Sequence, residues 1–392
     1  MLSKGACGKR GMRMGETTPI RVAQIMGKML GGGVESVVMN YYRNIDRAKV
    51  QFDFIVDADS TRIPKAEIEA LGGQVFTIPP YQQVIPYHRE LVSLLRREQY
   101  PIVHSHINVL SVFPLFAAKR AGIPVRIAHS HSTAGKGEFL RNAMKYALRP
   151  FSKTFATHYC ACAKHAGKWL FGSRAMKKGE VHIFHNAIDL DSFCFCKQTR
   201  AEVRQELGLP DGLVVGHVGR FMHQKNHKFL IEIFYELLKQ RPDAVLLLIG
   251  EGPLRKEAEM LVSQLGIADH VRFLGQRADA GRLYQAMDLF LFPSFYEGLA
   301  VVCIEAQTAN LPCLVSDQVA QETDILGSMD FFPLDSDAKN WADEGLQLLA
   351  KSGEREDCGE RMRAAGYDIR RAAKELEEYY LMLSGHQQRP GS

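Results

Sequence analysis

The sequence lacks any apolar run close to the roughly 20 residues that a helix needs to cross a bilayer. It also lacks a secretory signal, because its N-terminus carries basic side chains but no apolar stretch. We therefore expect a disordered leader over residues 1–18 and a cytoplasmic location. In that compartment the eight cysteines are expected to be reduced thiols.

A strong charge of either sign is also missing. The formal net charge is +5 over 392 residues, and no long run of lysine and arginine is present. This balance argues against nucleic acid as a partner. It suits a protein that handles phosphate groups or touches an anionic membrane surface.

Three common motifs of nucleotide-binding proteins and hydrolases are absent. The glycines at 31–33 do not have the spacing of a dinucleotide-binding G-x-G-x-x-G loop, and no phosphate loop with its lysine and serine or threonine occurs. A G-x-S-x-G nucleophile motif is missing as well. The sequence therefore favours neither a nicotinamide-dependent enzyme, nor a P-loop NTPase, nor a serine hydrolase.

The chain does contain short apolar strand candidates that alternate with helical segments. The first series lies at 21–27, 51–57, 74–79, 101–107, 125–131, 158–162 and 181–188, and the second at 213–220, 244–250, 271–275, 289–295 and 312–317. Such alternation predicts parallel, doubly wound sheets, and the chain is too long for one core. We expect an α/β protein with two Rossmann-like domains that face each other across a cleft.

The domain boundary is expected in a polar stretch that follows the first series of strands, at 196–212. The N-terminal domain then spans 19–195 and the C-terminal domain 196–368. The last segment, 369–392, carries a helix that could pack back on the N-terminal domain. In doubly wound sheets ligands bind at the carboxyl ends of the strands, so the chemistry is expected in the loops that follow them.

The most informative segment, at 293–317, follows a strand and opens a helix. Glu297 sits at the turn, and Glu305 is expected about two turns into the helix. Gly298 would let the chain approach a ligand closely, and the first amides of the helix could bind a diphosphate. Two carboxylates beside a phosphate suit contacts with sugar and ribose hydroxyls. The alternative is an ordinary helix charge and a surface glutamate.

A second segment places two cations just past a strand end. Arg220 follows Gly219, and Lys225 with Asn226 comes five residues later. An arginine fork and a mobile lysine can neutralise a departing diphosphate. Two solvated loop cations are the alternative interpretation.

Together these motifs resemble retaining glycosyltransferase family 4, of the GT-B fold. The resemblance rests on the order of GGGVES, RIAHSH, AGKWLFG, HNAID, the Arg220–Lys225 segment and the Glu297–Glu305 pair, and it covers about residues 20 to 380. It is strongest to bacterial exopolysaccharide and capsule glycosyltransferases. Asn310 stands where this family commonly has glycine after a helix, and asparagine tolerates the left-handed conformation needed there.

The resemblance implies a role for particular residues. Arg220 and Lys225 would bind the diphosphate, Glu305 the ribose hydroxyls, and Glu297 the donor sugar near the reacting carbon. Contacts from the other side of the cleft would come from His131, to the donor sugar, and from backbone amides of Gly32 and Gly33, to the β-phosphate. The donor site would also include Leu274, Gly275 and Gln276, which would hold the base through backbone groups, and Gly298, Leu299 and Ala300.

The implied reaction moves a sugar from a nucleoside diphosphate, most simply UDP, to an acceptor hydroxyl with retention of configuration, in exopolysaccharide, capsule or other cell-surface glycan synthesis. No cofactor and no metal would be needed. The acceptor would be a saccharide or a lipid-linked group. Two alternatives stay open: a non-catalytic nucleotide-sugar-binding protein, and another GT-B enzyme such as a sugar-nucleotide epimerase.

Three patterns could instead suggest a metal ion. Two cysteine pairs, Cys160 with Cys162 and Cys194 with Cys196, could form a thiolate site. Four histidines alternate at two strand ends, at 104, 106, 129 and 131. Aspartate pairs at 57–59, 189–191 and 335–337 resemble a metal motif of the other glycosyltransferase fold, but their scatter suggests coincidence. We favour ligand contacts and core hydrogen bonds for the histidines.

One further segment, at 139–153, combines a cationic stripe of Arg141, Lys145 and Arg149 with apolar residues around it. This pattern suits a helix that docks weakly on the inner face of a membrane. An ordinary amphipathic helix with its apolar side on the core is the alternative, and Pro150 is expected to end the helix early.

Overall fold

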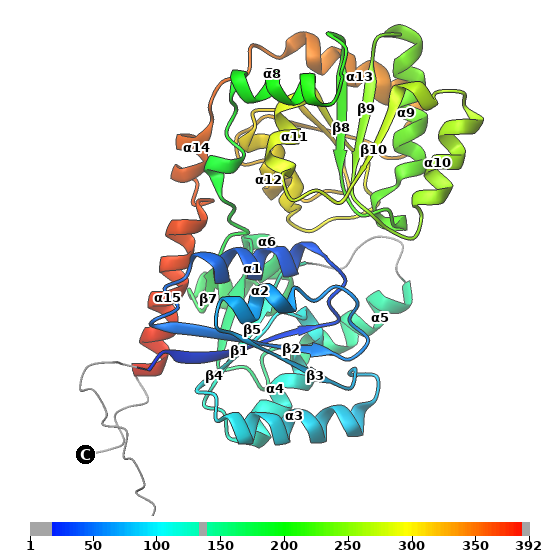
Figure 1. The fold of residues 1–392 in the computed structure, drawn as a ribbon. Helices are drawn as coiled ribbons and strands as arrows, with labels where there is room; N and C mark the ends of the chain where they lie inside the picture. Colours follow the sequence, from blue (N-terminus) through cyan, green and yellow to red (C-terminus); the bar gives the residue numbers. More distant parts are fainter. Residues whose placement is uncertain (1–17, 133–138, 386–392) are drawn as a thin grey trace, which may run out of the picture.

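The computed structural model describes residues 18–132 and 139–385, and these form two parallel β-sheets, each covered by helices on both faces (Figure 1). The first sheet has the order β3-β2-β1-β4-β5-β6-β7, and the second the order β10-β9-β8-β11-β12-β13. All registered strand pairs are parallel. The expectation of two doubly wound, Rossmann-like sheets is therefore confirmed.

The first sheet contains the strands of the first half of the chain. They are β1 (Ile20–Gly27), β2 (Val50–Asp57), β3 (Gln74–Ile78), β4 (Ile102–Ser105), β5 (Val125–Ser130), β6 (His158–Ala161) and β7 (Val181–Ile183). Its connecting helices are α1 (Gly33–Asn44), α2 (Lys65–Ala70), α3 (Val84–Glu98), α4 (Val112–Ala121), α5 (Phe139–Leu148), α6 (Lys164–Phe171) and α7 (Ser173–Lys177). The central strands are buried on both faces, because helices lie above and below them.

The second sheet contains β8 (Val214–Val218), β9 (Val245–Ile249), β10 (Val271–Gly275), β11 (Leu289–Phe292), β12 (Cys313–Ser316) and β13 (Met329–Phe332). Its helices are α8 (Lys197–Glu206), α9 (His227–Gln240), α10 (Arg255–Gln264), α11 (Ala280–Ala286), α12 (Val301–Thr308), α13 (Ala338–Lys351) and α14 (Gly359–Ala364). Strand β13 is absent from the sequence prediction, because four residues at a sheet edge give too short a pattern.

The polar stretch that follows the expected domain boundary forms helix α8. Its buried contact is Val203, and its cations reach across to Asp288, at 2.5 Å from Arg200 and 2.7 Å from Arg204. A helix held mainly by ion pairs has few apolar residues, which is why its composition resembles that of a linker.

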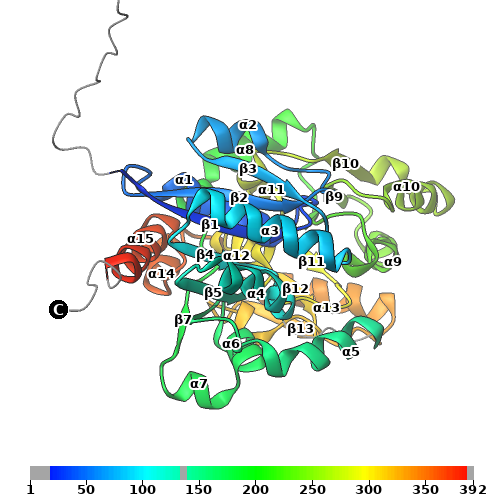
Figure 2. The ribbon, with the colours of Figure 1, turned by 90° about the horizontal axis from the view of Figure 1, so that it is seen from below.

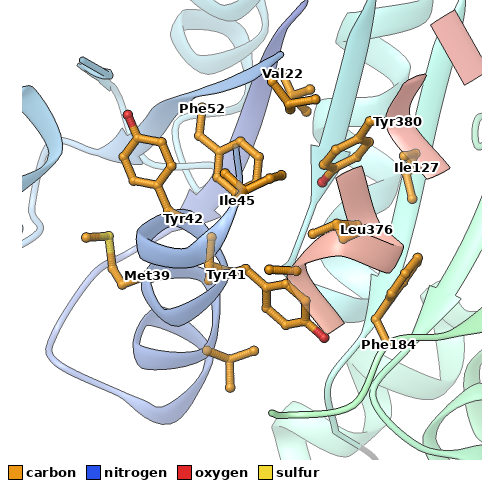
Figure 3. Packing of buried hydrophobic residues seen from close by; sticks show 14 of the residues in the cluster. Val22, Met39, Tyr41, Tyr42, Ile45, Phe52, Ile127, Phe184, Leu376 and Tyr380 are labelled. Atoms are coloured by element: carbon orange, nitrogen blue, oxygen red, sulfur yellow. The ribbon is translucent and has the colours of Figure 1, made fainter. Parts of the chain in front are cut away.

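The last helix, α15 (Ile369–Gly385), leaves the second sheet and packs along the first (Figure 1). Leu376 and Tyr380 join the core around Phe52 (Figure 3), and Tyr380 meets Phe52 edge-on with ring centroids 5.9 Å apart. Glu377 bonds Lys49 at 3.0 Å. The chain thus crosses between the two sheets twice, once before α8 and once at the start of α15.

None of the helices in the described residues is both long and apolar enough to span a bilayer. The region expected as an interfacial helix forms α5, followed by a 3-10 turn at Arg149–Phe151 that contains Pro150. The side chains of residues 139–142 lie outside the described part, as do residues 1–17.

Candidate donor-binding site

A cavity of about 540 Å³ lies between the two sheets and is lined by residues from both. The first sheet contributes the loop after β1 and the residues after β5, and the second contributes the loops after β8, β9, β10 and β11. These are carboxyl ends of parallel strands, which is where the topology predicts ligand binding.

The structure brings most of the predicted site residues together around this cavity. Those that line it are Gly32, Gly33, His131, Arg220, Lys225, Gln276, Glu297, Gly298, Leu299, Ala300 and Glu305. They come from segments as far apart as residues 32 and 305, so the shared cavity is a property of the fold rather than of sequence proximity.

Leu274 and Gly275 do not line the cavity. The Leu274 side chain packs against the core of the second sheet, and the Gly275 carbonyl accepts a hydrogen bond of 2.8 Å from the Gly250 amide. Of the three residues expected to hold the base, only Gln276 therefore lies at the cavity surface, next to Arg277.

Lys225 and Glu297 form an ion pair of 2.7 Å, and their side chains are only 14% and 10% exposed. The Lys225 ammonium also lies over the Phe292 ring, 4.4 Å from its centroid. Asn226 adopts the left-handed conformation (φ 54°) and ends the short turn that carries Lys225. Lys225 is thus held at the cavity by a carboxylate, an aromatic face and a fixed backbone.

Arg220 differs from Lys225 because it has no ion-pair partner among the residues that the structure describes. Its Nε atom is buried and has no hydrogen-bond partner among the described residues. A buried guanidinium nitrogen without an acceptor is costly unless a ligand satisfies it. The cavity therefore presents an unpaired cation to whatever binds there, and phosphate oxygens match the geometry of a guanidinium.

Glu305 lies on α12, which begins at Val301, so the carboxylate is just over one turn into the helix and not two as expected. The Tyr284 hydroxyl donates a hydrogen bond of 2.8 Å to Glu305. Burial raises the pKa of Glu305 from 4.5 to about 7, and this hydrogen bond opposes the rise. The carboxyl group is therefore expected to be about half ionised near pH 7.

Gly298 makes a close approach, but the neighbour is the first domain and not a ligand. A Cβ at this position would lie 3.0 Å from the His131 carbonyl oxygen. Asn186 adds a hydrogen bond of 3.1 Å to the Leu299 carbonyl, while its own Oδ1 is buried without a partner. Glycine is needed at 298 because the two walls of the cavity touch there.

The glycine-rich loop after β1 already binds an anionic group. The amides of Leu30, Gly31 and Gly32 donate to the Glu35 carboxylate at 2.8, 2.5 and 2.8 Å. The Gly32 amide is therefore occupied in this structure, and Gly33, at the first position of α1, offers the next one. The loop has the form of an anion-binding nest.

One contact across the cavity was not predicted from the sequence. Arg62, from the loop after β2, donates a hydrogen bond of 2.5 Å to Gln276 on the opposite domain. Both residues line the cavity. No motif marks Arg62, because its function depends on how the two domains are placed and not on its sequence neighbours.

The metal alternatives are not favoured by the geometry. Among the described residues, three histidines, at 104, 106 and 129, are the only group of three or more potential ligands close enough to share an ion. The two cysteine pairs and the three aspartate pairs form no such group within the same residues. The histidines bond one another and neighbouring polar side chains, as expected for a core hydrogen-bond cluster.

Comparisons with known proteins agree with this geometry. Residues 31–192 match the family model described as Glycosyltransferase Family 4, and residues 199–365 match that described as Glycosyl transferases group 1. The chain is similar to EpsF of Bacillus subtilis (strain 168), whose assignment as a glycosyltransferase is provisional. The two are 35% identical over 369 residues, which is 92% of this chain and 96% of EpsF.

The name of a more distant relative states both its donor and its acceptor. It is the UDP-Gal:alpha-D-GlcNAc-diphosphoundecaprenol alpha-1,3-galactosyltransferase of Escherichia coli, 26% identical over 308 residues, or 76% of this chain and 79% of that protein. Among solved structures, HepE of Anabaena in complex with UDP-glucose shares the fold, with a TM-score of 0.72 at 19% identity over 92% of this chain and 99% of HepE.

Proposed function

Because the chain belongs to glycosyltransferase family 4 and is a nucleotide-sugar-dependent glycosyltransferase, we propose that it transfers a sugar from UDP to a hydroxyl of a lipid-linked saccharide during synthesis of a cell-surface polysaccharide. The donor nucleotide is suggested by the UDP-glucose complex of HepE. The acceptor class is suggested by the diphosphoundecaprenol-linked substrate in the name of the Escherichia coli relative.

The observation that carries this proposal is the unequal charge pairing of the two cations. Lys225 is bonded to Glu297, whereas Arg220 has a buried Nε without a partner. A UDP-sugar would supply the missing acceptors through its diphosphate. Its ribose hydroxyls would meet Glu305, and the sugar would lie between Glu297 and His131. A neutral ligand would leave the positive charge of Arg220 without a counter-charge.

In the proposed reaction the acceptor hydroxyl attacks the anomeric carbon from the side of the leaving group. The bond between that carbon and the β-phosphate oxygen breaks, the new glycosidic bond forms, and the departing phosphate takes the hydroxyl proton. Charge develops on the β-phosphate, so stabilisation by Arg220, Lys225 and the first amides of α12 lowers the barrier. The rest of the catalysis is positioning of the two substrates.

The test is a thermal-shift screen of the full chain against a panel of nucleotide sugars, followed by assay of the binding donors. We expect stabilisation by a UDP-sugar and its slow hydrolysis without an acceptor. A donor that binds but is neither hydrolysed nor transferred would favour a binding protein. Conversion of the donor to its 2-epimer would favour an epimerase.

We also propose that the reaction needs no metal ion, because cationic side chains take the place beside the diphosphate that a metal would occupy. Transfer should then be equal in EDTA and in Mg²⁺ or Mn²⁺. Activity that is lost in EDTA and restored by one of these ions would contradict this part of the proposal.

A surface of the first domain supports contact with a membrane, as expected of a cytoplasmic enzyme acting at the inner face. Six of the eight large apolar side chains that the described residues expose lie on or beside α3, α4 and α5: Val84, Ile85, Phe116, Met144, Tyr146 and Phe151. Figure 2 shows these helices from below. Ring contacts of 4.9 Å link His88 on α3 to Phe116 on α4, and Phe116 to Phe155, so the parts of the patch on α3 and α4 are joined.

Two cations lie beside this patch. Arg149 is held over the Trp169 ring, and Lys119 lies over Phe155. Apolar side chains with cations beside them suit an anionic lipid surface, and each cation near such a surface contributes about 1 kcal/mol.

Co-sedimentation with vesicles rich in anionic lipid should therefore show weak, salt-sensitive binding. Replacing Ile85 and Phe151 with serine should abolish it, whereas a matched change of Met260 and Met382, which are exposed elsewhere, should not. Equal loss in both pairs, or none in either, would exclude this surface.

A further inference from the structure

Five hydrogen bonds join six buried side chains of the first domain into one continuous network. Its members are Gln24, His104, His106, His129, His131 and Tyr380, and each is no more than 6% exposed. They come from β1, from the ends of β4 and β5, and from α15, the helix that returns from the second sheet (Figure 3 labels Tyr380). The network therefore runs from the C-terminal helix to a residue that lines the candidate donor site.

The amide of Gln24 gives the first arm of the network a direction. Its nitrogen donates to the Tyr380 hydroxyl at 3.2 Å, so that hydroxyl donates onward to His104 Nδ1 at 2.5 Å. A neutral imidazole carries one proton, which for His104 must then be on Nε2. That nitrogen donates to His129 Nδ1 at 3.0 Å.

The second arm has the opposite direction and ends at the donor site. The Gln24 carbonyl can only accept, so His106 carries its proton on Nε2, 2.8 Å away. His106 Nδ1 must then accept from His131 Nε2 at 2.9 Å. This leaves His131 Nδ1 with a lone pair, and that atom is buried without a partner among the described residues.

All four imidazoles are expected to be neutral, as this arrangement requires. Burial lowers the pKa of His104 and of His131 to about 3, and it also lowers the pKa of His106 and of His129. Among the described residues, no carboxylate bonds any member of the network, so no counter-charge favours an imidazolium.

We propose that Gln24 and His106 are positioning residues that hold His131 as its Nε2-protonated tautomer, so that Nδ1 is the acceptor for a hydroxyl of the donor sugar. This inference rests on the proposed role of His131 in the donor site. Asn108 supports the same geometry, since its Oδ1 accepts from the His131 amide at 2.7 Å. Tyr380 at the far end keeps the amide of Gln24 in the orientation that sets the direction.

A metal ion in the cluster would require the ring lone pairs to converge on one point. Instead the His104 and His106 rings stack 4.3 Å apart at 28°, and the His129 and His131 rings stack 4.0 Å apart at 20°. The lone pair of an imidazole nitrogen lies in the plane of its ring. The lone pairs of two stacked rings therefore lie in parallel planes and do not converge on one point. The distances between the paired ring nitrogens, 2.9 and 3.0 Å, are also those of ordinary hydrogen bonds.

The direct test is a two-bond ¹⁵N–¹H correlation spectrum of the full chain labelled at histidine, with each signal assigned by single substitution. We expect His106 and His131 as Nε2–H tautomers at pH 7. The Nδ1–H form or an imidazolium at His131 would overturn the inference. Stoichiometric metal in the purified protein, with shifts typical of metal-bound imidazole, would overturn it as well.

Activity provides the second test through a matched pair at position 106. In His106→Asn, the Asn Oδ1 lies near the place of Nδ1 and keeps an acceptor for His131, whereas His106→Leu removes it at similar volume. We expect the leucine variant to lose about 10- to 100-fold in kcat/KM and the asparagine variant to stay within about threefold. An equal loss in both would overturn the inference.

A third test, with a second pair of variants, protects the inference from a folding defect at position 106. Tyr380→Phe should shift the ¹⁵N signals of His106 and His131 through Gln24. Tyr379→Phe, on the same helix but outside the network, should leave them in place. Unchanged signals in Tyr380→Phe would overturn the role of Gln24. If the tautomer is present but the wild type transfers no sugar, the proposed function fails instead.

Discussion

The two walls of the cavity position polar groups in opposite ways. The second domain places charges at the cavity surface and pairs only some of them: Lys225 with Glu297, while Arg220 keeps a free Nε. The first domain buries neutral histidines, and leaves its cations Lys28 and Arg62 at the exposed rim. The comparison suggests that the second domain stabilises charge on the donor, and that the first domain orients the sugar and closes the site.

The largest effect is expected at the ion pair of the charged wall. Lys225→Ala and Glu297→Gln should each lower kcat by roughly 10²- to 10³-fold, because the leaving group loses electrostatic stabilisation or the sugar loses its contact. Lys228→Ala, at the second position of α9 and exposed, should leave kcat unchanged. Near-normal turnover in either variant would remove that residue from the proposed machinery.

The same pair makes a separate prediction about stability. Each single variant leaves a mostly buried charge without its partner. The free energy of unfolding should therefore fall by about 1–3 kcal/mol after allowance for partial exposure, and each variant should unfold at a lower temperature. The double variant Lys225→Met with Glu297→Gln removes both charges and should recover most of that loss while staying inactive. A double variant less stable than both single variants would show that the pair is not the cause.

A smaller effect is expected at Glu305, and it depends on pH. Because the pKa of Glu305 is raised to about 7 in the folded state, the folded protein binds more protons than the unfolded chain between about pH 4.5 and 7. This residue therefore makes the wild type less stable as pH rises through that window. Glu305→Gln should gain thermal stability relative to the wild type at pH 8 compared with pH 5.

The control for this measurement is Glu232→Gln, a matched change on α9 outside the cavity. A constant offset between Glu305→Gln and the wild type at both pH values would contradict the raised pKa. Donor affinity of Glu305→Gln should fall by about tenfold, the cost of losing a charged hydrogen-bond acceptor.

The smallest effect is expected on the neutral wall. Arg62→Ala removes an exposed hydrogen bond to Gln276 and should raise KM for the donor by about two- to fivefold, with kcat unchanged. Lys65→Ala, close by but paired only with Glu69, is the matched control. A fall in kcat as large as that of Lys225→Ala would mean that the first domain also stabilises charge and would erase the distinction between the walls.

The sequence predicted the charged wall better than the neutral one, and there is a physical reason. Arg220, Lys225, Glu297 and Glu305 lie in two short segments at strand ends, where spacing alone places them at one edge of the sheet. The left-handed conformation expected at Asn310 is also confirmed, with φ of 49°. Local geometry of this kind is encoded in a few neighbouring residues.

Features that depend on tertiary placement could not be predicted in the same way. The bond between Arg62 and Gln276 joins residues 214 positions apart. The Glu35 carboxylate accepts a hydrogen bond from the Gly32 amide, which was expected to contact the β-phosphate. The Gly275 carbonyl accepts a hydrogen bond from the Gly250 amide. Helix α8 was not predicted, because its ion pairs are with Asp288, 84 residues or more away. Each of these needs the positions of distant segments, which one sequence does not contain.

The return of α15 to the first domain has a consequence for how the protein is made. Residues 369–385 complete the core around Phe52 and supply Tyr380 to the histidine network. A ribosome synthesises these residues after the second sheet, so one apolar face of the first sheet stays uncovered until the second domain has been translated. The first domain is therefore translated before the second but completes its core after it, and a chain that stops short of α15 would have two sheets but only one complete core.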